Sequence, residues 1–239
     1  MEKKTVVITG GSAGIGLSIV EHLLAANYRV VNLSRRGLSQ RSEDVEDYEI
    51  DLIDRDKLAA LCQELAVRDV YGFVHNAGII RADLIEDVSL DDLDDLNQLH
   101  LGAAIQLVQA ILPGMKKQGE GRIVLTSSRA SVGMKTRTSY SATKAAQIAL
   151  ARTWALELGE HGITVNTVAP GPIQSTDMFH EVVPKGSPVL EKMAEKIPLK
   201  RLGEPHDVAN AVMFFLDQKS SFVTGQNLFV CGGTSIESG

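Results

Sequence analysis

The 239-residue sequence predicts one α/β domain: a doubly wound parallel sheet of about seven strands with helices on both faces. Two observations support this fold class. Short runs rich in β-branched residues alternate along the chain with longer segments of helical periodicity, which is the order typical of parallel sheets. Several of these runs are apolar almost throughout, as expected of parallel strands that are buried on both faces.

The expected elements alternate between strand and helix. Seven segments are expected to be strands: Thr5–Thr9, Arg29–Ser34, Tyr48–Asp51, Val70–His75, Gly121–Ser127, Thr164–Ala169 and Gln226–Val230. Five segments are expected to be helices: Gly16–Asn27, Asp54–Ala66, Leu90–Lys117, Tyr140–Glu160 and Glu204–Leu216. The acidic run 91–95 lies at the N-terminus of the third of these helices, where carboxylates interact favourably with the helix dipole.

The composition excludes several classes of protein. With 44% hydrophobic and 23% charged residues, we expect residues 1–239 to form a single globular domain. The net charge of −6 argues against a general nucleic-acid binder. Two cysteines, Cys62 and Cys231, are too few for a disulfide framework and fit the reducing cytoplasm. The opening apolar run is too short for a signal peptide or a membrane span, and no metal-ligand spacing is evident, so we expect no membrane partner and no metal site.

Residues 174–198 separate a predicted strand from the last predicted helix. They contain three prolines and one glycine, interspersed with Met178, Phe179, Val182 and Val183. A connection of this length is either a surface insertion or a functional lid. The apolar residues favour a lid that forms one wall of a substrate pocket.

A glycine-rich turn, Thr9–Gly16, follows the first strand and opens the first helix. Its glycines are spaced Gly10-x-x-x-Gly14-x-Gly16, and glycine lets the backbone turn tightly and approach a pyrophosphate. The following helix N-terminus offers free N–H groups and the positive end of the helix dipole. The turn therefore predicts a dinucleotide site that includes Gly10, Ser12, Gly14, Ile15 and Gly16.

The end of the second strand indicates which dinucleotide is bound. An acidic residue here would bind the ribose 2′-hydroxyl of NAD, whereas an arginine would accept the 2′-phosphate of NADP. The chain has Ser34 at the expected acidic position, followed by Arg35 and Arg36. These arginines are either a solvated pair or a phosphate clamp; the clamp favours NADP, and NAD stays possible.

Tyr140 and Lys144 are four residues apart in a predicted helix, so their side chains share one face. An ammonium group beside a phenol stabilises the phenolate and lowers its pKa from about 10 toward neutrality. Such a tyrosine exchanges a proton with an alcohol oxygen, which a serine hydroxyl can also polarise. The strand register favours Ser128 as this serine, with Ser127 as the alternative.

Together these motifs resemble the classical short-chain dehydrogenase/reductases along nearly the whole chain. Thr9–Gly16 resembles the family's cofactor turn, while Ser128, Tyr140 and Lys144 match its catalytic serine and Y-x-x-x-K motif. Further segments match the family pattern: Asp51-Leu52, Asn76-Ala77-Gly78, Asn166, Pro170-Gly171-Pro172-Ile173, Thr176-Asp177-Met178, Arg201-Leu202-Gly203, Thr224-Gly225-Gln226 and Gly232-Gly233. In detail the chain is most similar to the 3-oxoacyl-carrier-protein-reductase-like branch.

The resemblance implies a Rossmann-type fold and adds residues to the cofactor site. It implies that Asp51 and Leu52 contact the adenine, that the Asn76, Ala77 and Gly78 motif ends the fourth strand at the cofactor, and that the segment from Pro170 flanks the nicotinamide. The full expected cofactor set is Gly10, Ser12, Gly14, Ile15, Gly16, Ser34, Arg35, Arg36, Asp51, Leu52, Asn76, Ala77, Gly78, Tyr140, Lys144, Pro170, Gly171, Ile173 and Thr176. It also implies a homotetramer, with a homodimer as the alternative.

Two positions depart from the family pattern. His75 stands where the family has the first asparagine of its N-N-A-G motif, and the end of a buried strand suits a structural histidine. His100 stands at the position of the usual catalytic asparagine, which holds a water in a proton relay to the lysine. His100 is either a relay member, and so a fourth catalytic candidate, or a buried histidine that bonds the helix backbone.

The function expected from these residues is reversible hydride transfer between NADP(H) and a ketone or secondary alcohol, with 3-oxoacyl compounds among the small-molecule substrates. Tyr140 would protonate the oxygen, Ser128 would donate a hydrogen bond to it, and Lys144 would lower the pKa of Tyr140. Two alternatives are an NAD-dependent alcohol, sterol or polyol dehydrogenase and a non-enzymatic nucleotide sensor. The presence of all three catalytic residues disfavours the sensor.

Overall fold

The structure is a computed structural model that describes residues 3–38, 42–174, 176, 179, 183 and 186–236. Its core is a seven-stranded parallel sheet in the order β3-β2-β1-β4-β5-β6-β7. The strands are β1 (Thr5–Thr9), β2 (Arg29–Ser34), β3 (Val45–Glu49), β4 (Gly72–His75), β5 (Gly121–Thr126), β6 (Ile163–Pro170) and β7 (Asn227–Val230). This arrangement confirms the predicted fold class.

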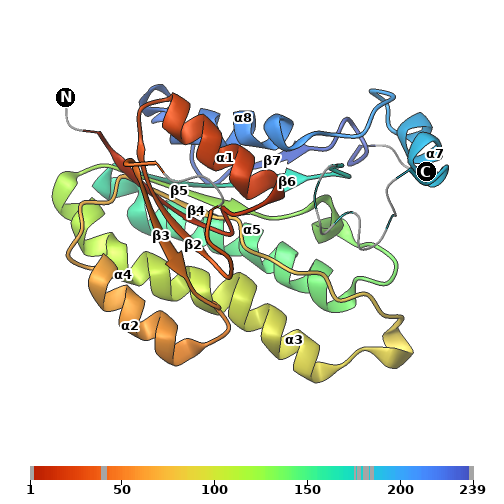
Figure 1. Cartoon of the computed structure of the whole chain (residues 1–239), viewed down its shortest axis with the longest axis horizontal. Helices are drawn as coiled ribbons and strands as arrows, with labels where there is room; N and C mark the ends of the chain where they lie inside the picture. The colour runs from red at the N-terminus through yellow and green to blue at the C-terminus, as the bar shows by residue number, and fades with distance from the viewer. Residues whose placement is uncertain are drawn as a thin grey trace.

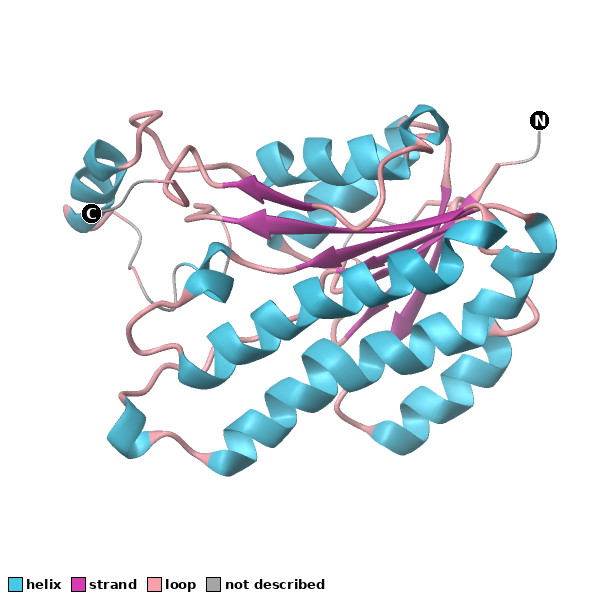
Figure 2. Cartoon of the chain, turned by 180° about the vertical axis from the view of Figure 1, so that it is seen from behind, coloured by secondary structure: helices cyan, strands magenta, loops and turns pink. Residues whose placement is uncertain are grey.

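Helices cover both faces of the sheet (Figures 1 and 2). On one face α1 (Gly14–Ala25) packs against α8 (Pro205–Leu216). On the other face lie α2 (Arg55–Leu65), α3 (Leu90–Asn97), α4 (Ala103–Gln118) and α5 (Thr138–Leu158). A separate short helix, α7 (Val189–Lys196), lies at the end of the molecule toward which the strands point (Figure 1). One apolar cluster fills each side of the sheet, which is why the central strands read as apolar throughout.

Strand order and register bring distant segments of the chain together at one edge. The order reverses between β1 and β4, and ligands of doubly wound sheets bind at such a switch point, beyond the carboxyl ends of the strands. Thr9 of β1 pairs with His75 of β4, and His75 pairs with Leu125 of β5. The glycine turn, the 76–78 motif and the two serines after β5 therefore leave the sheet side by side.

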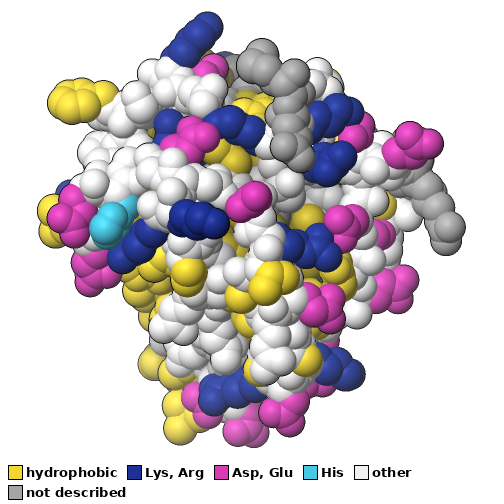
Figure 3. All heavy atoms as spheres, turned by 90° about the vertical axis from the view of Figure 1, so that its left-hand side faces the viewer, with side chains coloured by type: hydrophobic (Ala, Val, Ile, Leu, Met, Phe, Trp, Pro, Cys, Tyr) yellow, Lys and Arg dark blue, Asp and Glu magenta, His cyan; other side chains and the backbone are white. Residues whose placement is uncertain are grey.

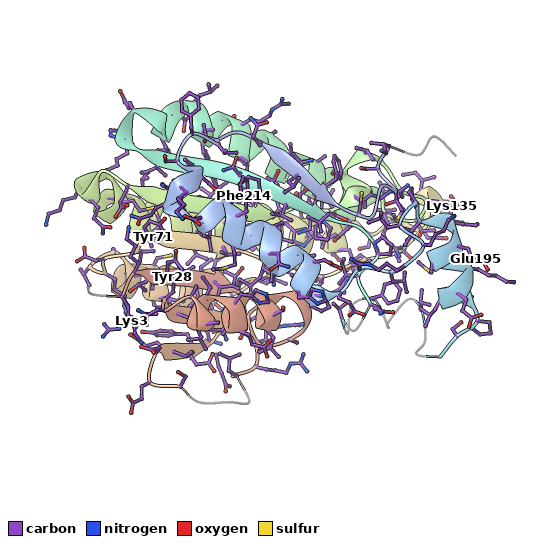
Figure 4. All side chains as sticks on the ribbon, turned by 90° about the horizontal axis from the view of Figure 1, so that it is seen from above. Lys3, Tyr28, Tyr71, Lys135, Glu195 and Phe214 are labelled. Carbon is purple, nitrogen blue, oxygen red and sulfur yellow. The ribbon has the colours of Figure 1, made fainter. Side chains whose placement is uncertain are left out.

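The opposite end of the sheet holds a network of surface charges. Lys4 forms an ion pair with Glu120 at 2.6 Å and lies 4.0 Å from the centroid of the Tyr71 ring. Figure 3 views this end, where basic and acidic side chains lie side by side, and Figure 4 shows Lys3, Tyr28 and Tyr71 far from α7. Within the described part of the chain, every helix is too short or too polar to cross a membrane.

Most predicted boundaries lie within two residues of those observed, and three predicted segments differ by more than that or in kind. Strand β3 runs over Val45–Glu49 and not Tyr48–Asp51, because it is a polar edge strand whose exposed residues give no apolar signal. The predicted helix Leu90–Lys117 is interrupted by a π-helical turn, η2 (Gln98–Gly102), between α3 and α4. Helix α7 lies inside the segment predicted as an irregular lid.

Candidate active site

A cavity of about 910 Å³ opens beyond the carboxyl ends of the strands. It is lined by every predicted cofactor residue except Gly16, and also by Ser128. Gly16 lies beneath the turn, where a Cβ would stand 1.9 Å from the Gly10 carbonyl oxygen. His100 does not line the cavity and is buried behind Gly78. Apart from Gly16 and His100, the residues predicted from the sequence thus line one continuous cavity.

The glycine turn forms a cradle that side chains would fill. Gly10 has a φ of 69°, and a Cβ there would stand 2.9 Å from the Cα of Ala77. Gly14 has a φ of 53°, in the left-handed region that favours glycine. Helix α1 begins there, beside the cavity, without a side-chain cap or an acidic residue in its first turn, so no side chain of this turn caps its first N–H groups. The cradle fits a pyrophosphate, which is held by such N–H groups and by the helix dipole.

Thr9 and His75 fix the cradle to the neighbouring strand. The Thr9 hydroxyl accepts the N–H groups of Asn76 and Ala77, each at 3.0 Å, and lies 3.1 Å from Nδ1 of His75. His75 Nε2 lies 3.0 Å from the Leu99 carbonyl oxygen, to which it donates. Burial lowers the pKa of His75 to about 3, so the ring is neutral and both nitrogens have partners. The prediction of a structural histidine is confirmed.

Asn32 organises the end of β2, and the sequence analysis missed it. Its Oδ1 accepts the Gly11 N–H at 2.9 Å, while its Nδ2 donates to Ser34 Oγ at 2.8 Å and to Asp47 at 2.6 Å. Ser34 in turn donates to the Arg36 carbonyl at 2.7 Å. This network holds the loop that presents the exposed arginines to the cavity. A single amide in an otherwise apolar strand was the signal that could have revealed it.

The two serines after β5 have different surroundings. Ser127 is 2% exposed, and its hydroxyl donates to the Lys144 carbonyl at 2.7 Å, which ties β5 to α5. Ser128 accepts the Ala130 N–H at 3.1 Å, and its side chain lies close enough to Tyr140 to lower the pKa of that phenol. The Ser127 hydroxyl is held by the Lys144 carbonyl, whereas the Ser128 side chain influences the tyrosine, so these surroundings favour Ser128.

Lys144 is buried beside Tyr140. Its Nζ lies 5.7 Å from the centroid of the tyrosine ring and donates to the Thr126 carbonyl at 2.7 Å and to Gln147 Oε1 at 3.1 Å. Burial lowers the pKa of Lys144 to about 7. Burial also raises the pKa of Tyr140 above its ordinary value of 10.0, against the opposing effects of the Ser128 side chain and the Arg137 charge.

The predicted lowering of the Tyr140 pKa by Lys144 is therefore wrong in this structure. The phenol is desolvated, which disfavours its charged form, and the lysine ammonium turns toward the Thr126 carbonyl. Sequence spacing gives the shared helix face but not the burial that sets the direction of the shift.

His100 lies in the π-helical turn between α3 and α4 and is fully buried. Its Nδ1 lies 2.9 Å from Thr143 Oγ1, and its Nε2 accepts the Ile79 N–H at 3.4 Å. Burial, followed by the charge of Lys144, holds the pKa of His100 well below 6.5. Both ring nitrogens of the neutral imidazole have partners, so the geometry favours a positioning role over a water relay. The ring also packs edge-on against Tyr140, with centroids 5.7 Å apart.

Comparisons with known proteins agree with this geometry. Residues 10–235 match the family model described as enoyl-(acyl carrier protein) reductase. The chain is 34% identical to a 3-oxoacyl-(acyl-carrier-protein) reductase FabG of Staphylococcus epidermidis, over 96% of this chain and 98% of that protein. A solved short chain dehydrogenase/reductase family protein is 33% identical with a TM-score of 0.89, covering 99% of both chains. The chain belongs to the short-chain dehydrogenase/reductase family. It is therefore an oxidoreductase.

Another solved relative carries a cofactor. The structure of ElxO with NADP bound is 27% identical to this short-chain dehydrogenase/reductase, with a TM-score of 0.90 over 99% of this chain and 100% of that one.

Described residues of the segment 174–198 line one side of the cavity of this short-chain dehydrogenase/reductase. Thr176, Phe179, Val183 and Met193 line it. A Cβ on Gly14 would stand 3.1 Å from the Thr176 methyl group, so the segment meets the glycine turn. Three residues named from the sequence lie outside the described residues: Asp177, Met178 and Val182.

Proposed function

We propose that the enzyme interconverts a ketone and a secondary alcohol with NADP(H), and that Tyr140 exchanges the proton. The observation that carries this proposal is that Ser128, Tyr140 and buried Lys144 lie together in the wall of the cavity that holds the glycine cradle. The bound nicotinamide supplies or accepts the hydride. The 3-oxoacyl-(acyl-carrier-protein) reductase of Staphylococcus epidermidis, to which the chain is similar, supports a 3-oxo compound as the substrate.

The chain's own residues supply the acid and the stabilising donor. As hydride reaches the carbonyl carbon, negative charge grows on the oxygen. Tyr140 keeps its proton at neutral pH because burial raises its pKa, so it is available as the acid. Ser128 donates a second hydrogen bond to the same oxygen, an interaction that strengthens as the charge develops. Lys144 packs below the tyrosine and, with a pKa of about 7, can return a proton toward it.

The cradle and the loop after β2 support NADP as the cofactor. The glycine turn and the α1 N-terminus fit the pyrophosphate, and Arg35 and Arg36 at the cavity edge fit a 2′-phosphate. Ser34 stands where an NAD enzyme would carry an acid, so an NAD-dependent alcohol, sterol or polyol dehydrogenase is less well supported.

We also propose that segment 174–198 acts as a lid, that the enzyme works as a homotetramer, and that it is cytoplasmic. The apolar side chains of the segment at the cavity wall support the lid. Leu156 is 87% exposed on α5, which supports an interface through that helix. Both cysteines are free thiols, as suits a reducing compartment.

A panel of ketones with NADPH, and of alcohols with NADP, tests the proposed reaction by the absorbance of the reduced cofactor. The proposal expects turnover of at least one ketone, with NADPH preferred over NADH. If no ketone and no alcohol reacts with either cofactor, the enzyme does not catalyse this reaction.

A further inference from the structure

Arg137 is a buried cation beside the catalytic tyrosine. It lies one helical turn before Tyr140 at the N-terminus of α5, is 8% exposed and lines the cavity. Its positive charge reaches the phenol, since it is one of the influences that lower the Tyr140 pKa. The proposed reaction does not use this residue.

Arg137 lines the cavity, and one nitrogen of its guanidinium is bound to the neighbouring residue of the chain. Its Nη1 donates to the carbonyl and the hydroxyl of Thr136, at 3.1 and 2.8 Å. Its Nε and Nη2 have no hydrogen-bond partner among the described residues, and neither atom is enclosed by protein. This open edge, with two parallel N–H donors, is the edge that binds a carboxylate in a bidentate way.

The backbone before Arg137 is strained in the conformation that holds it. Thr136 has a φ of 65°, which is rare for a β-branched residue. The two groups that accept hydrogen bonds from Arg137, the carbonyl and the hydroxyl of Thr136, are both held by this strained backbone. Strain of this kind persists where the surrounding structure fixes a functional geometry.

Among the described residues, no acidic side chain lines this part of the cavity. Apart from Lys144 and the two arginines near the cofactor cradle, the basic residues among the described lining residues are Arg129, Arg137 and Lys196. The single acidic residue among the described lining residues is Asp51. Asp51 follows β3, four strands from β5, which corresponds to roughly 19 Å at the usual strand spacing. Asp83 pairs with Arg137 through the backbone, but the two side chains form no ion pair within the described residues.

We propose that Arg137 binds the free carboxylate of the substrate, so that the enzyme reduces short oxo acids in preference to neutral ketones or thioesters. The inference rests on the proposed function and names its substrate class. Arg137 and Tyr140 are three residues apart at the N-terminal end of α5. One small molecule could therefore place its carboxylate at Arg137 and its ketone at Tyr140. Hydride adds to the ketone carbon, the carbonyl electron pair moves to oxygen, and that oxygen takes the proton of Tyr140.

The test compares each acid with its methyl ester, which keeps the ketone and removes the charge. The probes are 2-oxobutanoate, acetoacetate and 4-oxopentanoate, their methyl esters and acetoacetyl-pantetheine, all with saturating NADPH. We expect kcat/KM for at least one acid to exceed that for its ester by roughly 10- to 100-fold, the value of a charge-assisted bidentate pair. In Arg137→Gln we expect this preference to disappear, because kcat/KM for the acid falls by that factor whereas kcat/KM for the ester falls by about 3-fold at most.

Two variants and one binding measurement exclude a merely structural role. Arg137→Lys keeps the charge but not the paired donors, and we expect it to restore part of the preference. Lys135→Gln, which removes an exposed charge from the same loop outside the cavity lining, is the matched control (Figure 4). Calorimetric titration with butanoate and butanamide in the presence of NADP measures recognition without turnover; Arg137→Gln should weaken butanoate binding alone.

The outcomes separate the two proposals. If wild-type enzyme reduces the esters or the thioester as well as the acids, Arg137 does not select a carboxylate, while ketone reduction stands. If Arg137→Gln lowers acid and ester rates equally, the residue is structural and the inference is wrong. If wild-type enzyme reduces a ketone of the wider panel but none of these acids, the carboxylate inference is wrong and the proposed function stands; if no ketone and no alcohol reacts at all, the proposed function itself is contradicted. The acid-to-ester comparison needs no variant, so it holds even if Arg137→Gln does not fold.

Discussion

Nδ1 of His100 lies 2.9 Å from the hydroxyl of Thr143, the residue directly before Lys144 in α5. This contact ties the π-helical turn to the helix that carries the proposed acid. The His100 carbonyl also accepts a hydrogen bond from Gln147 Nε2 at 3.0 Å, and Gln147 Oε1 accepts one from Lys144 Nζ. A π-helical turn inserted at a functional site is a recurrent feature of enzymes.

We expect His100→Ala to lower turnover more than cofactor affinity, since the imidazole holds Lys144 and Tyr140 in place without touching the cradle. It should also lower the free energy of unfolding by roughly 2–4 kcal/mol, because a buried, hydrogen-bonded ring is lost. Steady-state kinetics, NADPH titration by fluorescence and urea unfolding measure the three quantities. Unchanged kcat in a folded variant would remove His100 from the catalytic machinery.

We expect the substitutions Ser128→Ala and Ser127→Ala to have different effects on kcat and on stability. Ser128→Ala loses the hydroxyl proposed to donate to the substrate oxygen, so we expect kcat to fall by roughly 100-fold with little loss of stability. Ser127→Ala loses a buried bond to the Lys144 carbonyl, so we expect about 1 kcal/mol less stability and a smaller loss of kcat. The reverse ranking of the two kcat values would assign the role to Ser127.

Burial of Lys144 makes stability depend on pH. The pKa of Lys144 is about 7 in the folded protein and near 10.5 in the unfolded chain, so between these values the unfolded state binds more protons. Its contribution to the free energy of unfolding therefore rises with pH from about 7 to 10.5 and is constant below and above this window. Urea unfolding of wild type and Lys144→Met at pH 7 and 9.5 measures it. We expect a smaller rise with pH in the variant; an equal rise would contradict the buried, shifted lysine.

Cofactor choice should depend on the loop after β2. We expect Arg35→Gln to weaken NADPH binding roughly tenfold and NADH binding much less, because only NADPH carries the 2′-phosphate. Arg29→Gln, at the exposed amino end of the same strand, is the control for loss of one positive charge. Fluorescence titrations of both cofactors give the ratio. If Arg35→Gln weakened NADPH binding and NADH binding equally, Arg35 would not contact the 2′-phosphate.

Local signals were enough to predict the cradle and the pair in α5. The glycines of the turn lie within seven residues, and a spacing of four in a helix places Tyr140 and Lys144 on one face. The β3 boundary was missed because an edge strand with exposed side chains has no apolar pattern. The π-helical turn was missed because one inserted backbone residue hardly disturbs the periodicity from Leu90 to Lys117.

The remaining features depend on the tertiary fold. The role of Asn32 requires the glycine turn, β2 and β3 to meet, and no local pattern encodes that meeting. The directions of the Tyr140 and Lys144 pKa shifts are set by burial, which spacing does not report. The surroundings of Arg137 depend on where the fold places each acidic side chain, and its position in the sequence reports only its charge.

The substitution Tyr140→Phe tests the central claim most directly, because it removes the proposed proton donor and keeps the ring that packs against His100. The measurement is kcat for the best ketone of the panel with saturating NADPH, alongside NADPH binding by fluorescence to establish that the site is intact. We predict a loss of roughly 100- to 10,000-fold in kcat, the contribution of a positioned general acid. A variant that binds NADPH and reduces the ketone at the wild-type rate would contradict the account.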